Sequence, residues 1–205
     1  MLVIIDYGVG NLGSIQNMLK KLGVDNVISS NKLDIENADK LILPGVGSFD
    51  YGMTKLTEGG FVDILNEKVL IRKTPILGIC LGVQLFTQSS EEGTKKGLGW
   101  FNAQTVKFNF PNESIPRKIP NMGWANTKCN SSSKLFTNMY EEPRFYFVHS
   151  YHLKSSNAHE VVCTSEYGYE FAAGLEKDNI IGVQFHPEKS HKYGMATLKN
   201  YCELY

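Results

Sequence analysis

The sequence predicts an α/β fold in which helices cover both faces of a mixed, mostly parallel β-sheet. Short continuous runs of apolar residues, typical of strands that are buried on both faces, alternate with segments whose apolar residues recur every three or four positions, as on one face of a helix. Such alternation is typical of parallel sheets with crossover helices. The chain has 205 residues, of which 42% are hydrophobic, and we expect one domain over residues 1–205.

The first half of the chain carries this alternation. The run Leu2–Ile5 predicts a buried strand, expected at the centre of the sheet, and the helix that follows can be capped by Asn11 and ended by Gly23. The same pattern then predicts, in order, strand 27–29, strand 40–43, a helical region 49–71 with a break at 59–60, strand 76–79 and a helix from Leu81.

In the second half, after about Gly97, the pattern of apolar and polar residues changes. Its strand-like runs are short and are separated by Pro, Asn and Ser clusters, which predicts that part of this half is antiparallel. The segment 109–138 is rich in the same residues, but it also holds Met122, Trp124 and Phe136, so we expect an ordered surface loop rather than a flexible tether. The expected strands are 104–108, 145–148, 161–164, 171–176 and 180–184.

The charge and cysteine content exclude several classes of function. The 21 basic and 21 acidic side chains balance, so no overall charge draws the chain to nucleic acid or to an anionic membrane. The longest nearly apolar run, 76–86, is far shorter than the ~20 residues that cross a bilayer, and the first residues do not resemble a secretory signal. We therefore expect a cytoplasmic protein. The cysteines are too far apart for a metal pair or a dense disulfide framework, and each is read as a single thiol: Cys80, Cys129, Cys163 and Cys202.

A cysteine between two glycines marks the junction of a predicted strand and a predicted helix. In the segment Gly78-Ile-Cys-Leu-Gly82 the glycines permit a sharp turn that places Cys80 at the start of the helix. The helix dipole and the free N–H groups there favour a thiolate and an oxyanion. Cys80 is therefore a candidate nucleophile, although a buried cysteine that serves as a small apolar side chain is the alternative.

One of the five histidines lies in a matching position. His186 follows the predicted strand 180–184, at the strand end where catalytic groups of α/β sheets collect, and Pro187 stiffens the turn. Glu188 can accept the second imidazole N–H and so fix the tautomer. Alone, these residues are also compatible with a solvent-exposed loop. Together with Cys80, they predict a Cys-His-Glu triad.

These segments resemble the class I glutamine amidotransferases, and in particular the glutaminase subunits of imidazole glycerol phosphate synthase. The resemblance spans nearly the whole chain. Its motifs are IDYGVGN at 5–11, LPGVGSF at 43–49, GICLG at 78–82, PNMGW at 120–124, FVHSY at 147–151 and FHPEKS at 185–190. It implies a flavodoxin-like three-layer α/β/α fold, the class I glutamine amidotransferase fold, and the hydrolysis of L-glutamine to glutamate and ammonia without a metal or an organic cofactor.

The resemblance also assigns catalytic roles to residues. It implies that Cys80 attacks the carboxamide, that His186 activates Cys80 and then protonates ammonia, and that Glu188 orients His186. The implied oxyanion donors are backbone N–H groups of Leu81 and of Val46-Gly47. Without the resemblance, the loop that contains Val46-Gly47 would be read as an ordinary tight turn.

Four further residues are implied to contact the substrate. A carboxylate at Glu92 suits the α-amino group of free glutamine, and Gln84 suits another polar group of the same molecule. Either residue is also compatible with a solvated helix side chain. The implied pocket residues are Gln84, Glu92, Ser150 and Tyr151, the last two through main-chain contacts.

In the family, the glutaminase docks on a separate (β/α)₈-barrel cyclase that uses the ammonia in histidine biosynthesis. Trp124 suits an interface anchor but equally suits a cover for the edge of the core. The chain departs from the family pattern at two positions, with Asn121 where the family has His and Ala125 where it has Asn, which leaves the catalytic assignment intact and weakens the partner assignment. The residues implied to face the cyclase are Asn11, Pro120, Trp124 and Tyr146.

Three other interpretations stay open from the sequence. The first is a second copy of this glutaminase that supplies ammonia for amidation of a cell-surface sugar, which the segment His191–Gly194 resembles. The second is another cysteine hydrolase of the same fold, such as a γ-glutamyl hydrolase or a deglycase-like protein; the PGVG loop and the order of His186 and Glu188 argue against a deglycase. The third is a phosphate-binding loop at 5–11, which lacks the third glycine and the lysine of such motifs.

Overall fold

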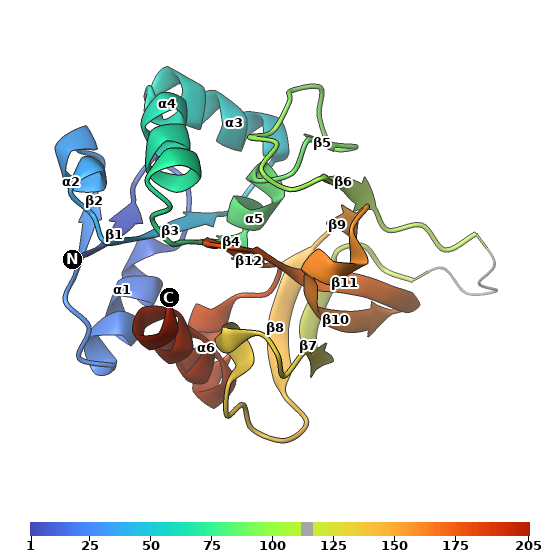
Figure 1. Ribbon diagram of the computed structural model, residues 1–205. Helices are drawn as coiled ribbons and strands as arrows, with labels where there is room; N and C mark the ends of the chain where they lie inside the picture. Colours follow the sequence, from blue (N-terminus) through green and yellow to red (C-terminus); the bar gives the residue numbers. More distant parts are fainter. Residues whose placement is uncertain (112–116) are drawn as a thin grey trace.

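The computed structural model describes residues 1–111 and 117–205, and its strands join in one mixed sheet (Figure 1). The strand order is β2-β1-β3-β4-β12-β11-β10-β7-β8, and β5, β6 and β9 pair beside this path. The strands are β1 (Leu2–Ile5), β2 (Asn26–Ser29), β3 (Lys40–Gly45), β4 (Ile76–Cys80), β5 (Ser89–Ser90), β6 (Ala103–Lys107), β7 (Asn121–Cys129), β8 (Arg144–His149), β9 (Tyr151–Ser155), β10 (Val161–Tyr167), β11 (Tyr169–Lys177) and β12 (Ile180–Val183).

The first five strands of this order run parallel and confirm the fold predicted for the first half of the sequence. β1 was expected at the centre, but it lies second from the edge, between β2 and β3. An apolar run indicates that a strand is buried on both faces, and it carries no information about the order of strands in the sheet. The chain returns late, in β12, to occupy the position beside β4.

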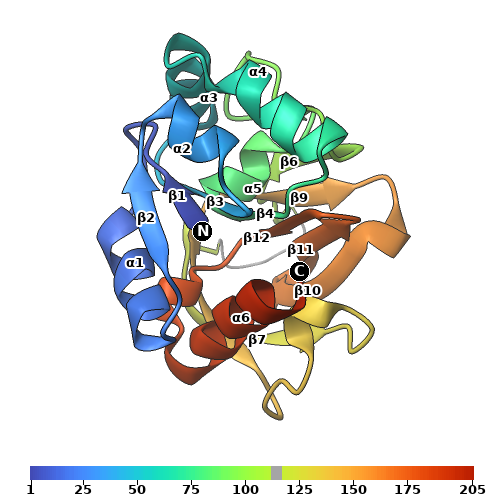
Figure 2. The ribbon, with the colours of Figure 1, turned by 60° about the vertical axis from the view of Figure 1, so that its left-hand side comes forward.

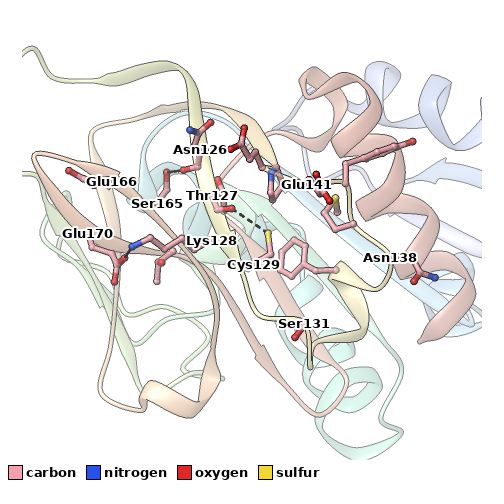
Figure 3. Close-up of a pocket in the computed structure, with 16 residues that line it drawn as sticks. Asn126, Thr127, Lys128, Cys129, Ser131, Asn138, Glu141, Ser165, Glu166 and Glu170 are labelled. Atoms are coloured by element: carbon pink, nitrogen blue, oxygen red, sulfur yellow. Dashed lines mark hydrogen bonds and ion pairs between the residues drawn. The ribbon is translucent and has the colours of Figure 1, made fainter.

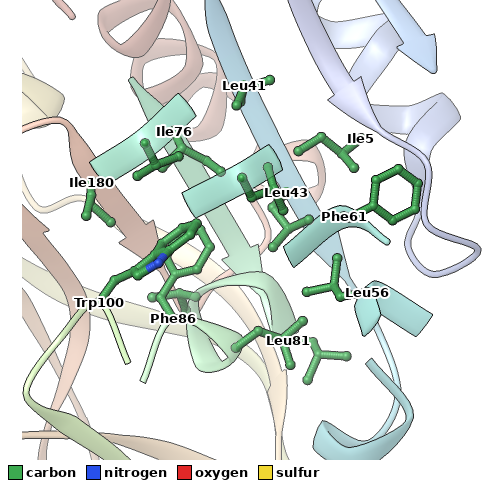
Figure 4. Packing of buried hydrophobic residues seen from close by; sticks show 14 of the residues in the cluster. Ile5, Leu41, Leu43, Leu56, Phe61, Ile76, Leu81, Phe86, Trp100 and Ile180 are labelled. Atoms are coloured by element: carbon green, nitrogen blue, oxygen red, sulfur yellow. The ribbon is translucent and has the colours of Figure 1, made fainter. Parts of the chain in front are cut away.

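Helices cover both faces of the parallel half, as Figure 2 shows. Val3 and Ile5 pack with residues of α2, α3 and α4, whereas Leu2 and Ile4 pack with residues of α1 and α6, because successive residues of a strand point to opposite faces. Figure 4 shows part of the first cluster, around Ile5 and Leu43. The helical segments are α1 (Leu12–Lys21), α2 (Lys32–Glu36), α3 (Phe49–Glu58), α4 (Phe61–Asn66), η1 (Glu67–Ile71), α5 (Leu81–Leu85), η2 (Lys134–Phe136), η3 (Ala158–Glu160), η4 (Pro187–Lys189) and α6 (His191–Leu204).

The ends of α1 illustrate what local sequence specifies. Gly23 adopts a φ of 72°, as expected for a glycine that ends a helix. Asn11 precedes the helix, but its side chain makes no capping hydrogen bond, because its backbone (φ −94°, ψ 67°) lies outside the extended region typical of such caps. Among the described residues, no helix combines the length and the apolar character needed to span a bilayer.

The segment 109–138 is not the surface loop that we expected. It contains the nine-residue strand β7, which pairs antiparallel with β8 from Asn121↔His149 to Asn126↔Arg144. The buried positions of β7 carry the polar residues Asn121 and Thr127, whereas Met122 is exposed, so the usual alternation of apolar and polar residues is reversed. Residues 112–116 of the expected loop lie outside the described residues. The sequence also does not predict the short elements α2 and β9.

Glycines allow α5 to lie directly against the backbone of the parallel strands. A Cβ atom on Gly82 would lie 1.9 Å from the carbonyl oxygen of Leu43 in β3. In β4, a Cβ on Gly78 would lie 2.7 Å from the backbone nitrogen of Val83, and in β12 a Cβ on Gly182 would lie 2.1 Å from Cγ2 of Val83. The glycines expected at the turn around Cys80 are therefore needed for the close approach of the helix and the sheet.

We predict that Gly82→Ala destabilises the protein by about 2–3 kcal/mol or more, because the added methyl group overlaps a backbone oxygen that cannot move without shifting β3. The matched control is Gly13→Ala in α1, where a Cβ meets no atom within 4 Å and the helix gains from the alanine. Urea unfolding of the two variants measures the difference. Equal free energies of unfolding for both variants would contradict this account of the turn.

Candidate active site

Cys80 ends β4 and immediately precedes α5, with a φ of 55° and a ψ of −109°. A positive φ in a residue other than glycine costs on the order of 1–3 kcal/mol and persists where the surrounding packing imposes it. The Cys80 residue is 7% exposed and lines a cavity of about 470 Å³. The predicted strand-to-helix turn is therefore present, with the thiol at the wall of a cavity.

His186 and Glu188 form a buried pair just after β12. The Nδ1 atom of His186 lies 2.7 Å from Oε1 of Glu188, and both side chains are almost fully buried. The Nε2 atom of His186 makes no hydrogen bond of regular geometry within the described residues, which leaves it available to the cavity. Burial lowers the pKa of His186, but interactions with Cys80 and Glu188 raise it more, to about 10. A protonated imidazole is therefore favoured while Cys80 is a thiolate.

The cavity collects nearly all the residues that the sequence predicted for the site. Glu188 does not line it and acts on it through His186. Pro120, expected on the partner surface, also lines it. Its lining residues are Val46, Gly47, Ser48, Cys80, Leu81, Gln84, Glu92, Pro120, Val148, His149, Ser150, Tyr151 and His186.

A second, larger cavity of about 590 Å³ lies beside β7 and β10 (Figure 3). Its wall carries Lys128, Cys129 and Glu170, and it includes none of the residues that the sequence predicted for the site. Lys128 forms an ion pair with Glu170, with 2.8 Å between Nζ and Oε2. The residues predicted for the site therefore line the smaller cavity and not the larger one.

A hydrogen bond from the N-terminal motif IDYGVGN holds the loop that contains the expected oxyanion donors Val46-Gly47. The buried hydroxyl of Tyr7 donates a hydrogen bond to the carbonyl oxygen of Pro44 at 2.8 Å. Burial raises the pKa of Tyr7, and the nearby Cys80 raises it further, so the hydroxyl stays protonated and remains a donor. Gly47 has a φ of 100°, and Leu81 occupies the first turn of α5, where backbone N–H groups are free of intrahelical bonds.

Glu92 connects the cavity to the first turn of α3. Its Oε2 accepts a hydrogen bond from the backbone N–H of Phe49 at 2.8 Å, which places a carboxylate at the N-terminus of that helix. In return, Asp50 of α3 accepts hydrogen bonds from the backbone of Thr94 and Lys95. Glu92 is thus not a solvated helix side chain, since it lies in a loop that is fastened to the helix after the oxyanion loop.

Gln84 belongs to a buried chain of amide groups that reaches the nucleophile. Its Nε2 donates to the carbonyl oxygen of Tyr151 at 3.1 Å and to Oε1 of Gln184 at 3.0 Å. Gln184 in turn donates from Nε2 to Sγ of Cys80 at 3.8 Å. Sequence reasoning missed Gln184, although its position two residues before His186 could have indicated it.

His149 is a second residue that sequence reasoning missed. It is buried, it lines the cavity, and its ring lies among Phe108, Phe147 and Phe171. Burial lowers its pKa to about 4, so the imidazole is neutral at neutral pH. Its place in the motif FVHSY, directly before Ser150 and Tyr151, was the available signal.

Two of the residues expected on the partner surface contact each other. Trp124 of β7 is 44% exposed, and its ring packs edge to face on the ring of Tyr146 of β8, with 6.3 Å between the ring centroids. The ring of His191 stacks on the ring of Trp124, with 5.4 Å between the centroids. The guanidinium of Arg144 lies 5.8 Å from the centre of the Trp124 ring. Among the described residues, no hydrogen bond or ring contact joins Asn11 to this group, which we call the Trp124 surface.

Residues 3–203 match the family described as glutamine amidotransferase class-I. The chain is 55% identical over 203 residues to imidazole glycerol phosphate synthase subunit HisH 2 of Methanococcus maripaludis, which covers 99% of each chain. It is 46% identical over 204 residues to HisH 2 of Pseudomonas aeruginosa and 44% identical over 204 residues to HisH of Leptospira interrogans, both over 100% of each chain.

Solved structures support the fold. A crystal structure titled glutamine amidotransferase superposes with a TM-score of 0.73 at 16% identity and covers 98% of each chain. A glutamine amidotransferase from Thermotoga maritima gives a TM-score of 0.62 at 19% identity, over 100% of this chain and 81% of the other. The expected fold class is therefore confirmed. The chain belongs to the class I glutamine amidotransferase family and, within it, to the HisH subunits of imidazole glycerol phosphate synthase.

Proposed function

We propose that the chain hydrolyses L-glutamine to glutamate and ammonia in the cavity at Cys80 and passes the ammonia to a (β/α)₈-barrel cyclase, as the glutaminase half of an imidazole glycerol phosphate synthase. One observation supports the site above all others. A cysteine at a strained strand-to-helix turn and a buried His-Glu pair, which come from distant parts of the sequence, meet at the same cavity.

In this proposal the Cys80 thiolate attacks the carboxamide carbon, and backbone N–H groups of Leu81 and Val46-Gly47 hold the resulting oxyanion. The His186 imidazolium gives its proton to the departing nitrogen, so ammonia leaves and a thioester remains. Neutral His186 then takes a proton from water, which attacks the thioester, and glutamate is released with the thiolate restored. Glu188 keeps Nδ1 occupied, so that Nε2 carries the proton that moves.

Substrate recognition is assigned to Gln84, Glu92 and the backbone of Ser150 and Tyr151. All four line the cavity beside Cys80, which supports the assignment. The carboxylate of Glu92 suits the ammonium group of free glutamine, and the bond from Phe49 leaves its other oxygen for that role. Binding of the substrate would therefore act on the same carboxylate that stabilises the start of α3.

The Trp124 surface is proposed to face the cyclase. The departures from the family pattern are not exposed: Asn121 is buried, and Ala125 is partly buried and packs against the core. This burial supports the partner assignment, because neither departure changes the exposed ring of Trp124. We propose further that residues 1–205 act as one domain in the cytoplasm, which the single sheet and the four free thiols support.

A glutaminase for surface-sugar amidation is the second candidate. One observation favours it: His191, the first residue of the segment that resembles this paralogue, stacks on Trp124 and so contributes to the proposed partner surface. Two relatives of the chain are named HisH 2. The glutaminase chemistry is the same in both candidates, and only the acceptor differs.

We predict that Cys80→Ala, assayed with the synthase partner present, lowers glutaminase activity by on the order of 10⁴-fold or more, because the nucleophile is lost. A glutamine-like electrophile should label Cys80 alone. Burial raises the pKa of Cys129 to about 12 and that of Cys202 to about 11, and it raises that of Cys163 as well, so these thiols are poor nucleophiles at neutral pH. Cys202→Ala is the matched control and should keep full activity. Ammonia release by the Cys80→Ala protein at near wild-type rate would refute the mechanism.

We predict that Trp124→Ala weakens binding of the cyclase by about 2 kcal/mol or more, as expected for a central aromatic anchor. The matched control is Tyr51→Ala, which removes a ring of similar exposure from α3. Titration calorimetry measures both affinities. Synthesis from added ammonium salt should persist in the Trp124→Ala complex while the glutamine-dependent reaction falls. An equal affinity for both variants would place the partner on another face.

Complementation decides between the two acceptors. A histidine-requiring strain without its own glutaminase receives this chain together with the cyclase from the same organism and grows on low ammonia. We predict growth, because the chain supplies ammonia to that cyclase, and no growth with Cys80→Ala in its place. Failure of the wild-type chain to support growth, with both proteins folded and soluble, would favour the sugar acceptor.

A further inference from the structure

Buried polar side chains connect the strand of Trp124 to the nucleophile. The Nδ2 atom of Asn121, in β7, lies 3.1 Å from Nε2 of His149, in β8. The Nδ1 atom of His149 lies 2.8 Å from the carbonyl oxygen of Tyr151. The same oxygen accepts the hydrogen bond from Gln84, and the series of hydrogen bonds continues through Gln184 to Sγ of Cys80. Nothing in the mechanism above uses Asn121 or His149.

The acceptor at Tyr151 determines the state of His149. A carbonyl oxygen only accepts, so Nδ1 of His149 must carry the hydrogen. Because burial lowers the pKa of this imidazole to about 4, Nε2 is unprotonated at neutral pH and accepts from the amide of Asn121. Each nitrogen of His149 is therefore either a donor or an acceptor, and the Asn121 amide must turn its N–H group toward Nε2 of His149.

The two ends of this connection lie in different environments. Asn121 faces inward at 5% exposure, while Met122 and Trp124 of the same strand face outward at 63% and 44%. Asn121 and His149 are register partners in the antiparallel pair β7-β8, so the position of β7 sets the position of the amide that contacts His149. At the other end, Tyr151 and Gln84 line the cavity.

We propose that Asn121 and His149 are positioning residues of the glutaminase site, which hold the Tyr151 carbonyl and, through Gln84 and Gln184, the substrate pocket against Cys80. This inference rests on the proposed function. Neither side chain performs chemistry. They fix the pocket wall from the side of the partner surface, and Asn121 occupies a position where the family pattern has His, which can donate an N–H to the same acceptor.

The test separates positioning from stability by a double-variant cycle. Asn121→Leu removes the N–H donor to His149 and keeps a side chain of similar volume. His149→Phe removes both hydrogen bonds of the imidazole and keeps an aromatic ring, which can pack among the same aromatic side chains. Each single variant leaves one buried polar group without its partner and should be destabilised. The double variant replaces both groups with apolar side chains, so its melting temperature should recover toward the wild-type value.

Activity should not recover with stability. We expect kcat/KM for glutamine, measured with the synthase partner present, to fall on the order of 10²-fold in both single variants and in the double variant, since the pocket is misplaced in all three. Alkylation of Cys80 by a glutamine-like chloroketone should slow in parallel, whereas alkylation by iodoacetamide should change little. Asn121→His, which keeps an N–H donor at this position, should retain a kcat/KM near that of the wild type, and Asn126→Leu, an exposed position on the same strand, is the matched control.

Each outcome decides the inference. A stable double variant with wild-type kcat/KM, or an Asn121→Leu variant with wild-type kcat/KM, overturns it, because the pair would then serve stability alone. If the double variant does not fold, the comparison of Asn121→Leu with Asn121→His decides in its place. A wild-type protein that releases no ammonia from glutamine with its partner present refutes the proposed function instead, and this failure is seen before any variant is made.

Discussion

The close contact between α5 and the backbone of three parallel strands is the constraint on which the site depends. Without the glycines of β4, α5 and β12, the helix could not lie near enough to the sheet to hold Cys80 at a φ of 55°. That conformation is unfavourable in isolation and is sustained by the two cores above and below the sheet. Local sequence thus specifies the turn, and the packing of the whole parallel half maintains it.

The parts of the site that could be predicted from the sequence lie at the carboxyl ends of neighbouring strands. β3 leads into the loop of Val46-Gly47, β4 ends at Cys80, and β12 leads to His186, and these strands are adjacent in the sheet. Because the ends of parallel strands meet at one edge, motifs far apart in sequence are brought together once the strands are identified. The apolar runs identify these strands but not their order in the sheet, so the grouping was predicted from the motifs at the strand ends and from the family that they resemble.

The antiparallel half could not be predicted in the same way. β7 buries Asn121 and Thr127 and exposes Met122 and Trp124, so its sequence has the composition of a loop although its backbone pairs with β8 and then with β10. The amide of buried Asn121 pairs with His149 of β8, and such a partner in another element is invisible to local patterns. Gln184 and His149 lie beside or within motifs that the sequence singled out, but their roles depend on hydrogen bonds to residues distant in sequence.

The reversed pattern of β7 also follows from where the strand lies. The inward face of β7 places Asn121 against His149, which lines the cavity at Cys80, and the outward face carries Met122 and Trp124, where a partner is proposed to bind. In a strand, these two sets of residues alternate along the chain. A substitution at an inward position such as Asn121 therefore changes the site without changing the outer surface. Departures from a family pattern in such a strand have to be assigned to one face before they are interpreted as a change of partner.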